Sequence, residues 1–309
     1  MLKWIGILVA GLVIVTGAAL WWLTIGFSHA PKSADGMFDI ATWRSLAGSM
    51  DGPLPVRIEV QEVGHDKAPL LAARAGAFGQ EWQTSYNAVR VVYPDGAILI
   101  GGAVDRAMAE SMVQDKNEWS FDDAAYEQLI KAISTASQVL MTHEHRDHII
   151  AIARYPDAEA LAPHLWANAA QIAALPRYVS PLPEAFRTLQ PRLSGEVEAV
   201  APGIVAVPAP GHTPGSQLVF IKLQSGEEYL LIGDIVWSMS SIEELTMRPV
   251  LTQYVVFDPN EDRAAIKDQI RAIHDLMADE PGLIVFPSHD RIWLEKLAAE
   301  GKIGWGFTN

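Results

Sequence analysis

Four potential metal ligands lie within six residues of this chain, in the segment Thr142-His143-Glu144-His145-Arg146-Asp147-His148. The segment follows an apolar stretch at 138–141 that predicts the end of a buried strand, and it precedes an apolar stretch at 149–153 that can form a helix. In an extended chain the side chains of His143, His145 and Asp147 would point to one side, while His148 would face a neighbouring ion. Two imidazoles on one side suit a zinc-like cation, and the density of ligands disfavours the alternative of solvated histidines in a charged loop.

Three further polar side chains follow apolar stretches elsewhere in the chain. Asp234 follows a predicted strand at 229–232, and His289 follows one at 283–286. His212 lies between predicted strands at 204–207 and 218–221, in the segment Pro210-Gly211-His212-Thr213-Pro214-Gly215. Prolines and glycines on both sides make this a tight turn that fixes the imidazole on rigid backbone. Ligands at several strand ends can converge on one edge of a sheet.

The composition restricts the chemistry of such a site. The chain contains no cysteine, which excludes disulfides and thiolate zinc sites, so imidazole and carboxylate must hold any metal. That donor set favours an open, hydrolysis-competent site over a closed structural one. The formal net charge of −14 and the absence of a Lys/Arg stripe argue against nucleic acid as a partner.

The first thirty or so residues predict a membrane anchor. Residues 4–27 are apolar or small, interrupted by Thr16 and Thr24, and at about 1.5 Å per residue they can cross a hydrocarbon layer of about 30 Å. Trp21 and Trp22 suit the membrane interface. A cleavable signal peptide is the alternative, because Ser28-His29-Ala30 resembles a cleavage site, but such signals have shorter apolar cores of about 7–15 residues. We expect residues 1–30 to form an uncleaved single-pass anchor with the catalytic domain outside the cytoplasm.

The rest of the chain predicts a linker and one domain. Residues 31–55 are rich in proline and glycine and predict a linker with a short helical turn near 38–46. In residues 56–309, strands are expected at 56–63, 86–93 and 97–100, and helices at 121–133 and around 266–277. The order of strands followed by helices occurs twice, which predicts two sheet layers with helices outside them.

Four motifs, in this order, resemble the metallo-β-lactamase superfamily: His143-x-His145-x-Asp147-His148, Gly211-His212-Thr213-Pro214-Gly215, Gly233-Asp234 and Ser288-His289-Asp290. The resemblance covers about residues 56–295 and implies an α+β fold, a four-layer αββα sandwich, with a dinuclear site at one edge. It implies two divalent ions, Zn²⁺ being expected, and a hydroxide between them as nucleophile. The metal ligands that it implies are His143, His145 and His212 for one ion, Asp147, His148 and His289 for the other, and Asp234 between them. Asp147 and Asp234 would be the catalytic carboxylates.

A second resemblance, to the N-acyl homoserine lactonase branch, rests on Phe257-Asp258-Pro259, the predicted helix near Arg263, and His289-Asp290. The chain departs from the family pattern where the strand at 98–100 runs into Gly101-Gly102-Ala103. A carboxylate that supports the ligands is either missing there or replaced by Asp105.

The second departure concerns the substrate. The lactonase branch has a tyrosine three residues after the bridging aspartate, where this chain has Trp237, with a weaker donor and a large apolar face. Tyr254 is the alternative phenol. We therefore expect Trp237 and Tyr254 as candidate substrate contacts.

These observations predict a metal-dependent hydrolase of a small-molecule carboxylic ester or lactone. A phosphodiesterase of the same fold and a catalytically inactive, membrane-anchored binding protein are the alternatives. Glu144 and Arg146 are expected to point away from the metals, in salt bridges or as groups that orient ligands. The remaining histidines are expected to be structural or solvated: His29, His65, His164 and His274.

Overall fold

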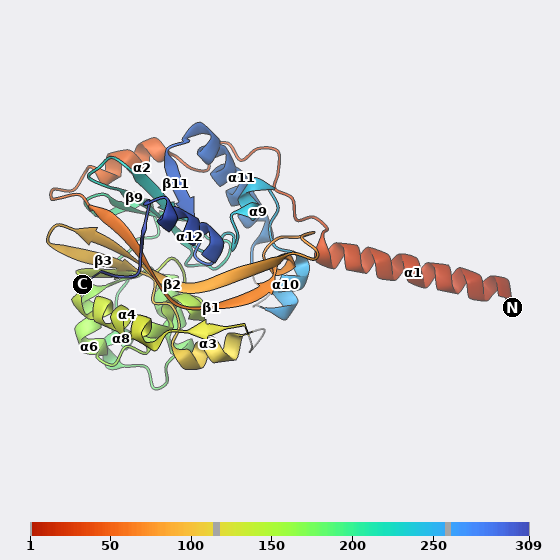
Figure 1. Cartoon of the computed structure of the whole chain (residues 1–309), viewed down its shortest axis with the longest axis horizontal. Helices are drawn as coiled ribbons and strands as arrows, with labels where there is room; N and C mark the ends of the chain where they lie inside the picture. The colour runs from red at the N-terminus through yellow and green to blue at the C-terminus, as the bar shows by residue number, and fades with distance from the viewer. Residues whose placement is uncertain (1, 114–117, 257–260, 309) are drawn as a thin grey trace.

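Two β-sheets lie face to face in the computed structural model, which describes residues 2–113, 118–256 and 261–308 (Figure 1). Among these residues the first sheet has seven strands, in the order β12 (Gly304–Trp305), β1 (Arg57–Pro69), β2 (Glu81–Tyr93), β3 (Gly96–Ile100), β5 (Gln138–Leu140) and β6 (Leu165–Trp166), with β4 (Ser120–Phe121) paired to β1. The second has five, in the order β11 (Leu283–Phe286), β10 (Glu228–Leu231), β9 (Gln217–Lys222), β8 (Ile204–Pro208) and β7 (Glu198–Ala201).

Both sheets carry apolar side chains on both faces. In β3, Ile98 and Ile100 join the core between the sheets, whereas Leu99 joins the core on the outer face. In β9, Val219 faces the other sheet and Phe220 faces outward. This alternation follows from the two-residue period of a strand. A sheet that is apolar on both faces must be covered on its outer side, and helices provide the cover.

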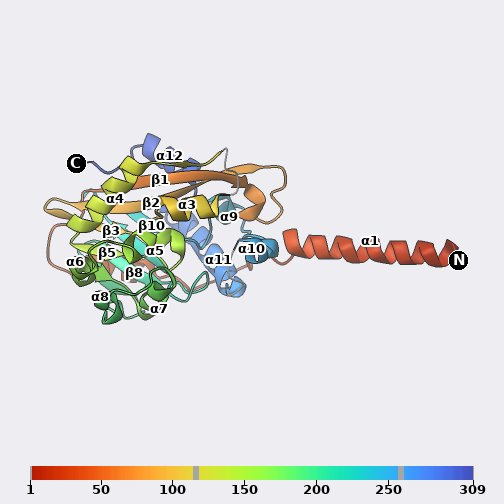
Figure 2. The same ribbon diagram turned by 90° about the horizontal axis from the view of Figure 1, so that it is seen from below.

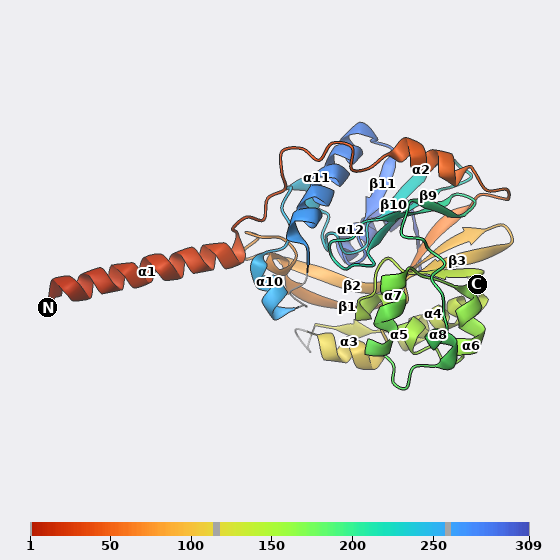
Figure 3. The ribbon, with the colours of Figure 1, turned by 180° about the vertical axis from the view of Figure 1, so that it is seen from behind.

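Helices cover the outer face of each sheet, as Figures 2 and 3 show. On the first sheet lie α3 (Arg106–Met112), α4 (Asp123–Thr135), α5 (Arg146–Ala153), α6 (Ala158–Leu161), α7 (Ala169–Ala174) and α8 (Glu184–Arg187), with the 3₁₀ turns Ala162–His164 and Leu175–Arg177. On the second lie α2 (Ile40–Ala47), α9 (Ser240–Glu243) and α11 (Arg263–Asp279). Helix α12 (Arg291–Ala299) adds Leu294 and Leu297 to the core between the sheets. The predicted αββα layering is confirmed.

The elements predicted from periodicity agree with the structure to within a few residues. The strands at 204–207, 218–221, 229–232 and 283–286 and the helices at 121–133 and 266–277 correspond to β8, β9, β10, β11, α4 and α11. The hairpin strands β1 and β2 are longer than expected and extend beyond the body of the sheet toward α10 (Val250–Val255) (Figure 1). The segment Phe257-Asp258-Pro259 lies outside the described residues.

The helical turn predicted near 38–46, within the expected linker at 31–55, corresponds to α2, which packs on the second sheet. Trp43 is only 1% exposed and packs against Phe38 and Phe220, with ring centroids 5.6 and 5.9 Å away. The neighbouring Arg44 forms ion pairs with Glu228 and Glu280, at 2.7 Å each. An indole buried on the sheet makes this helix part of the folded domain, although its flanks are rich in proline and glycine.

Helix α1 (Leu2–Thr24) projects from the domain as a single rod (Figure 1). Its segment Lys3–Thr24, with a mean hydropathy of 2.2, is long and apolar enough to cross a membrane by length and composition. The chain after it is fastened to the domain, because the Met247 amide donates to the Ser28 carbonyl at 2.9 Å and the Ala30 amide to the Leu245 carbonyl at 2.8 Å.

We predict that Trp43→Ala destabilises the full-length protein in detergent, because it leaves a cavity between α2 and β9. The free energy of unfolding, measured by chemical denaturation, should fall by about 3–5 kcal/mol. Trp305→Ala is the matched control, because Trp305 is 42% exposed and its removal leaves a smaller void. Equal losses in the two variants would mean that α2 does not contribute to the core.

Candidate metal centre

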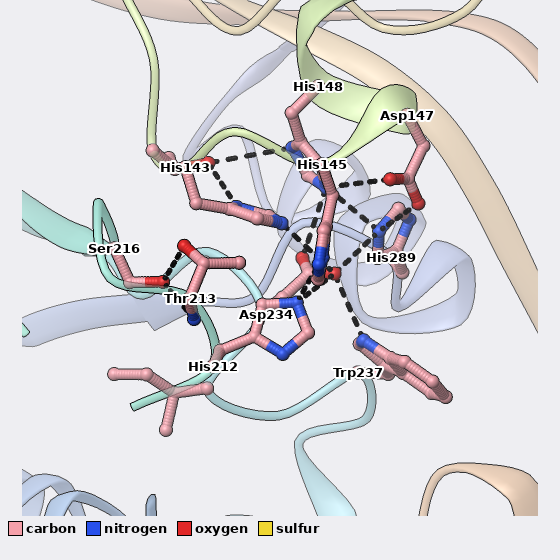
Figure 4. A network of polar contacts seen from close by, with 12 residues as sticks. His143, His145, Asp147, His148, His212, Thr213, Ser216, Asp234, Trp237 and His289 are labelled. Atoms are coloured by element: carbon pink, nitrogen blue, oxygen red, sulfur yellow. Dashed lines mark hydrogen bonds and ion pairs between the residues drawn. The ribbon is translucent and has the colours of Figure 1, made fainter. Parts of the chain in front are cut away.

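The predicted ligands lie at one edge of the two sheets. Strand β9 is antiparallel to β8 and β10, and β10 is parallel to β11, so β8, β10 and β11 run in the same direction. The loops that follow them therefore lie at the same edge and carry His212, Asp234 and His289. His143 and His145 follow β5 of the facing sheet, and the side chains meet between the sheets (Figure 4).

The structure arranges seven predicted ligands in two groups whose ligand atoms lie within 4.8 Å of one another. The groups are His143, His145 and His212, and Asp147, His148, Asp234 and His289. All are buried except His145, which is partly exposed. Asp234 lies between the groups, because its Oδ2 is 3.6 Å from His212 Nε2 and 3.1 Å from His289 Nε2.

The expectation that the motif is extended through Asp147 is wrong. Helix α5 begins at Arg146, and the His148 amide donates to the His145 carbonyl at 3.0 Å, which closes the first turn. Asp147 therefore leaves the side of His143 and His145, and its Oδ2 lies 3.3 Å from His289 Nε2. A carboxylate in the first helical turn also interacts favourably with the helix dipole.

The donor set fits divalent cations. His145 Nδ1 lies 2.8 Å from His212 Nε2, and His148 Nε2 lies 3.1 Å from His289 Nε2. Within the described residues, three buried atoms in the centre make no hydrogen bond: His143 Nε2, Asp147 Oδ1 and Asp234 Oδ1. Buried polar atoms without partners are costly, and cations that accept nitrogen and oxygen ligands would satisfy them.

Burial and mutual electrostatics set the protonation of these groups. Burial, together with the neighbouring imidazoles, lowers the pKa of His143 well below its usual range and that of His145 to about 3. Both rings are therefore neutral at pH 7, the form that binds metal. Burial would raise the pKa of Asp234, but His289 and His148 lower it well below its usual range. The carboxylate is therefore ionised.

Groups outside the two clusters orient the imidazoles. His143 Nδ1 lies 3.1 Å from Thr142 Oγ1, and His289 Nδ1 donates to the Ser85 carbonyl at 2.7 Å. Such contacts fix which ring nitrogen carries the proton and turn the other nitrogen toward the centre. Asp105, the expected replacement carboxylate, instead caps α3 and pairs with Arg154 at 2.7 Å. The contact to His143 comes from the Thr142 hydroxyl instead of from a carboxylate.

A buried ion pair, which the sequence analysis missed, supports His212. His212 Nδ1 lies 2.6 Å from Glu261 Oε1, and Arg248 Nε lies 2.9 Å from the same oxygen. Arg248 Nη2 also lies 2.8 Å from His212 Nδ1. A ring nitrogen that donates to Glu261 cannot accept from Arg248, so we assign the proton to Nδ1 and the supporting role to the carboxylate. Neither Arg248 nor Glu261 belongs to a ligand motif, so no local signal marks them.

Glu144 joins the two loops that carry the first group. It accepts hydrogen bonds from Thr213 Oγ1 at 2.7 Å and from the Gly215 amide at 3.0 Å. A Cβ at Gly215 would overlap Glu144 Oε2, so the close approach needs glycine. As predicted, Glu144 is not among the grouped ligands. Arg146, which was expected to point away from the metals, lines a cavity together with Asp147.

That cavity, of about 410 Å³, opens beside the second group. Asp147 and His289 form part of its wall, and the rest is mainly apolar, including Leu71, Trp82, Met112, Trp237, Leu251 and Val255. Trp237 stacks on Trp82 with a centroid distance of 6.3 Å, and its Nε1 donates to Asp234 Oδ2 at 3.0 Å. Tyr254 is 67% exposed and is absent from the described lining of the cavity.

No protein-family model and no curated protein matches the sequence. Among solved structures, an N-acyl homoserine lactone hydrolase with N-hexanoyl-L-homoserine at its catalytic metal centre is 15% identical (TM-score 0.57; 79% of this chain, 96% of that chain). A quorum-quenching N-acyl homoserine lactone lactonase is 16% identical (0.56; 80% and 97%), and a dizinc quorum-quenching lactonase is 13% identical (0.52; 76% and 88%). The chain therefore has the metallo-β-lactamase fold, in the form found in N-acyl homoserine lactonases.

Proposed function

We propose that this protein is a metal-dependent hydrolase that cleaves a carboxylic ester or a lactone. The observation that carries the proposal is the buried convergence of five histidines and two aspartates beside a largely apolar cavity. The shared fold supports it, because solved structures with this fold include lactone hydrolases, one of them dizinc. An apolar wall suits the acyl or aryl part of an ester better than a phosphodiester.

We propose that His143, His145 and His212 hold one divalent ion and that Asp147, His148 and His289 hold a second. The position of Asp234 between the groups supports a bridging role for its carboxylate. Zn²⁺ suits these imidazole and carboxylate donors. When bound, such ions polarise a carbonyl and lower the pKa of water toward about 7, which supplies hydroxide at neutral pH.

The protein's own groups orient the reaction. Asp147 lies on the cavity wall, and we assign to it the acceptance of a proton from the attacking water and its transfer to the leaving alkoxide. Trp237 holds Asp234 through its indole N–H, so it would meet the substrate through its ring face. Together with Trp82, it keeps water from one side of the cavity. We assign no substrate contact to the exposed Tyr254.

We further infer that residues 1–30 form an uncleaved single-pass anchor and that the catalytic domain lies outside the cytoplasm. Helix α1 has exposed apolar side chains along its length and carries Trp21 and Trp22 near its end, as an interfacial belt requires. The hydrogen bonds of Ser28 and Ala30 to the domain support an anchor that stays attached.

The substrate class is tested with full-length, zinc-loaded protein in detergent. We expect hydrolysis of aryl esters and aliphatic lactones to exceed hydrolysis of a bis(aryl) phosphodiester in one metal-defined preparation. The physical reason is that the mainly apolar wall accommodates the acyl or aryl part of a neutral ester, whereas a phosphodiester anion would lose its hydration against that wall. A higher phosphodiesterase rate would overturn the proposal, and a metal-loaded but inactive protein would favour a binding role.

We predict that His145→Ala lowers the metal content from two equivalents toward one and abolishes most of the ester hydrolysis. The variant removes a ligand from the first group and leaves the four side chains of the second in place. Elemental analysis after gel filtration gives the metal content. His164→Ala is the matched control, because His164 lies on the surface and bonds to the Ser137 carbonyl. Two equivalents in His145→Ala would contradict the ligand assignment.

We predict that Glu261→Gln weakens metal binding by about 10–100-fold, as is typical when a group that orients a ligand is lost. An amide does not balance the charge of the buried Arg248, and it holds the Nδ1–H of His212 more weakly. Chelator competition measures the affinity. The control is Glu227→Gln, which removes an exposed ion pair with Lys302 (3.1 Å) and should leave the metal affinity unchanged. Equal affinities in all three proteins would show that Glu261 does not position His212.

A further inference from the structure

The end of α1 lies against the wall of the cavity. The Gly76 amide donates to the Thr24 carbonyl, the last residue of α1, at 3.0 Å. Gly76 belongs to the loop after the 3₁₀ turn η1 (Leu70–Ala72), and Leu71 and Ala72 of this turn line the cavity. Helix α1 also contacts α10, which contributes Leu251 and Val255 to the lining (Figures 1 and 3). The cavity is therefore at the end of the domain that faces the anchor.

Four large side chains around this end are more than half exposed, and we call them the apolar rim: Phe27, Phe78, Tyr254 and Val255. They come from the chain after α1, from the loop after η1 and from α10. Val255 also lines the cavity, so the rim is continuous with its wall. Trp21, in the last turn and a half of α1, packs edge-on against Phe27 at 5.6 Å. Because indoles settle at membrane interfaces, a bilayer crossed by α1 would have the rim at the level of its lipid headgroups.

The connection between α1 and the domain holds this orientation. Ser28 is fully buried, its carbonyl accepts from the Met247 amide at 2.9 Å, and its Oγ accepts from Arg263 Nη2 at 3.2 Å. Lys267 Nζ donates to the Phe27 carbonyl at 3.2 Å, a position suited to lipid phosphates. A fastened connection prevents the domain from turning the rim away from the membrane.

We propose that the apolar rim inserts into the interface of the bilayer that α1 crosses, and that the cavity takes its substrate from that bilayer. The substrate class is then a long-chain ester or lactone that partitions into lipid, with its acyl chain against Leu71, Leu251 and Val255 and its carbonyl toward Asp147 and His289. The substrate part of this inference rests on the proposed hydrolase function. The placement of the rim rests instead on the proposed membrane anchor.

The placement is tested without activity. Because the chain has no cysteine, Phe78→Cys provides a unique site for an environment-sensitive fluorophore in full-length protein reconstituted into phosphatidylcholine vesicles. Nitroxides near the lipid headgroup should quench this label. Met50→Cys is the control, since Met50 is also exposed but follows α2, away from α1 in Figure 1, and its label should not be quenched. Equal quenching at the two sites, or none at Phe78, would overturn the placement.

The substrate class is tested with two esters that share one leaving group, a short-chain ester in water and a long-chain ester carried in the vesicles. Phe27→Asp and Phe78→Asp should raise the apparent KM for the long-chain ester by about tenfold, because a charge in the rim opposes insertion. Turnover of the short-chain ester should not change, because neither side chain lines the cavity. Met50→Asp should alter neither reaction.

The outcomes separate the two proposals. An unchanged KM for the long-chain ester in both rim variants, with the short-chain ester still hydrolysed, would overturn the delivery of substrate from the bilayer and leave the hydrolase assignment in place. Absence of ester hydrolysis in the metal-loaded wild type would overturn the proposed function and, with it, the substrate class. The quenching experiment would still decide where the rim lies.

Discussion

The structure depends on the packing of seven ionisable side chains, all buried except the partly exposed His145, at the edge where the two sheets meet. Removing these groups from water is costly, and several ligand atoms have no hydrogen-bond partner within the described residues. Divalent cations would offset that cost, because imidazole nitrogens and carboxylate oxygens together coordinate such ions. Such a cluster therefore makes the fold and the metal site interdependent.

Hydrogen bonds around the cluster hold the loops and the His212 ring in place. Glu144 joins the loop after β5 to the turn that carries His212, and Arg248 with Glu261 holds the same imidazole from the opposite side. A metal site needs this support, because contacts from outside fix each ring in the orientation that turns its free nitrogen toward the centre. The hydrogen bonds of this outer layer come from both sheets and from the start of α11, so the site depends on the whole sandwich.

The cavity lies at the end of the domain from which α1 projects. The long hairpin of β1 and β2 and helix α10 extend the sandwich toward α1, and their apolar side chains form the cavity wall. A soluble hydrolase would expose little apolar surface beside its entrance, because such patches promote aggregation. In this chain the same side chains surround the exit of a helix that is apolar enough to cross a membrane. Trp21 of α1 contacts Phe27 of the rim, and Val255 of the rim lines the cavity.

By itself, the sequence determined the local features: apolar strands with two-residue alternation, the amphipathic α11, the N-terminal apolar helix, and His or Asp residues just after strands. Convergence at one edge was expected because these residues follow strands, and the parallel pairing of β10 and β11 in the structure brings Asp234 and His289 to the same edge. The tertiary structure alone decided that Asp147 turns away from His143 in a helix, that α2 is part of the core, and that Glu261, Arg248 and Ser85 support the imidazoles. It alone also placed the cavity beside α1. Periodicity is local and can be read along the chain, whereas contacts between segments far apart in sequence, such as His289 with Ser85, depend on how the two sheets pack.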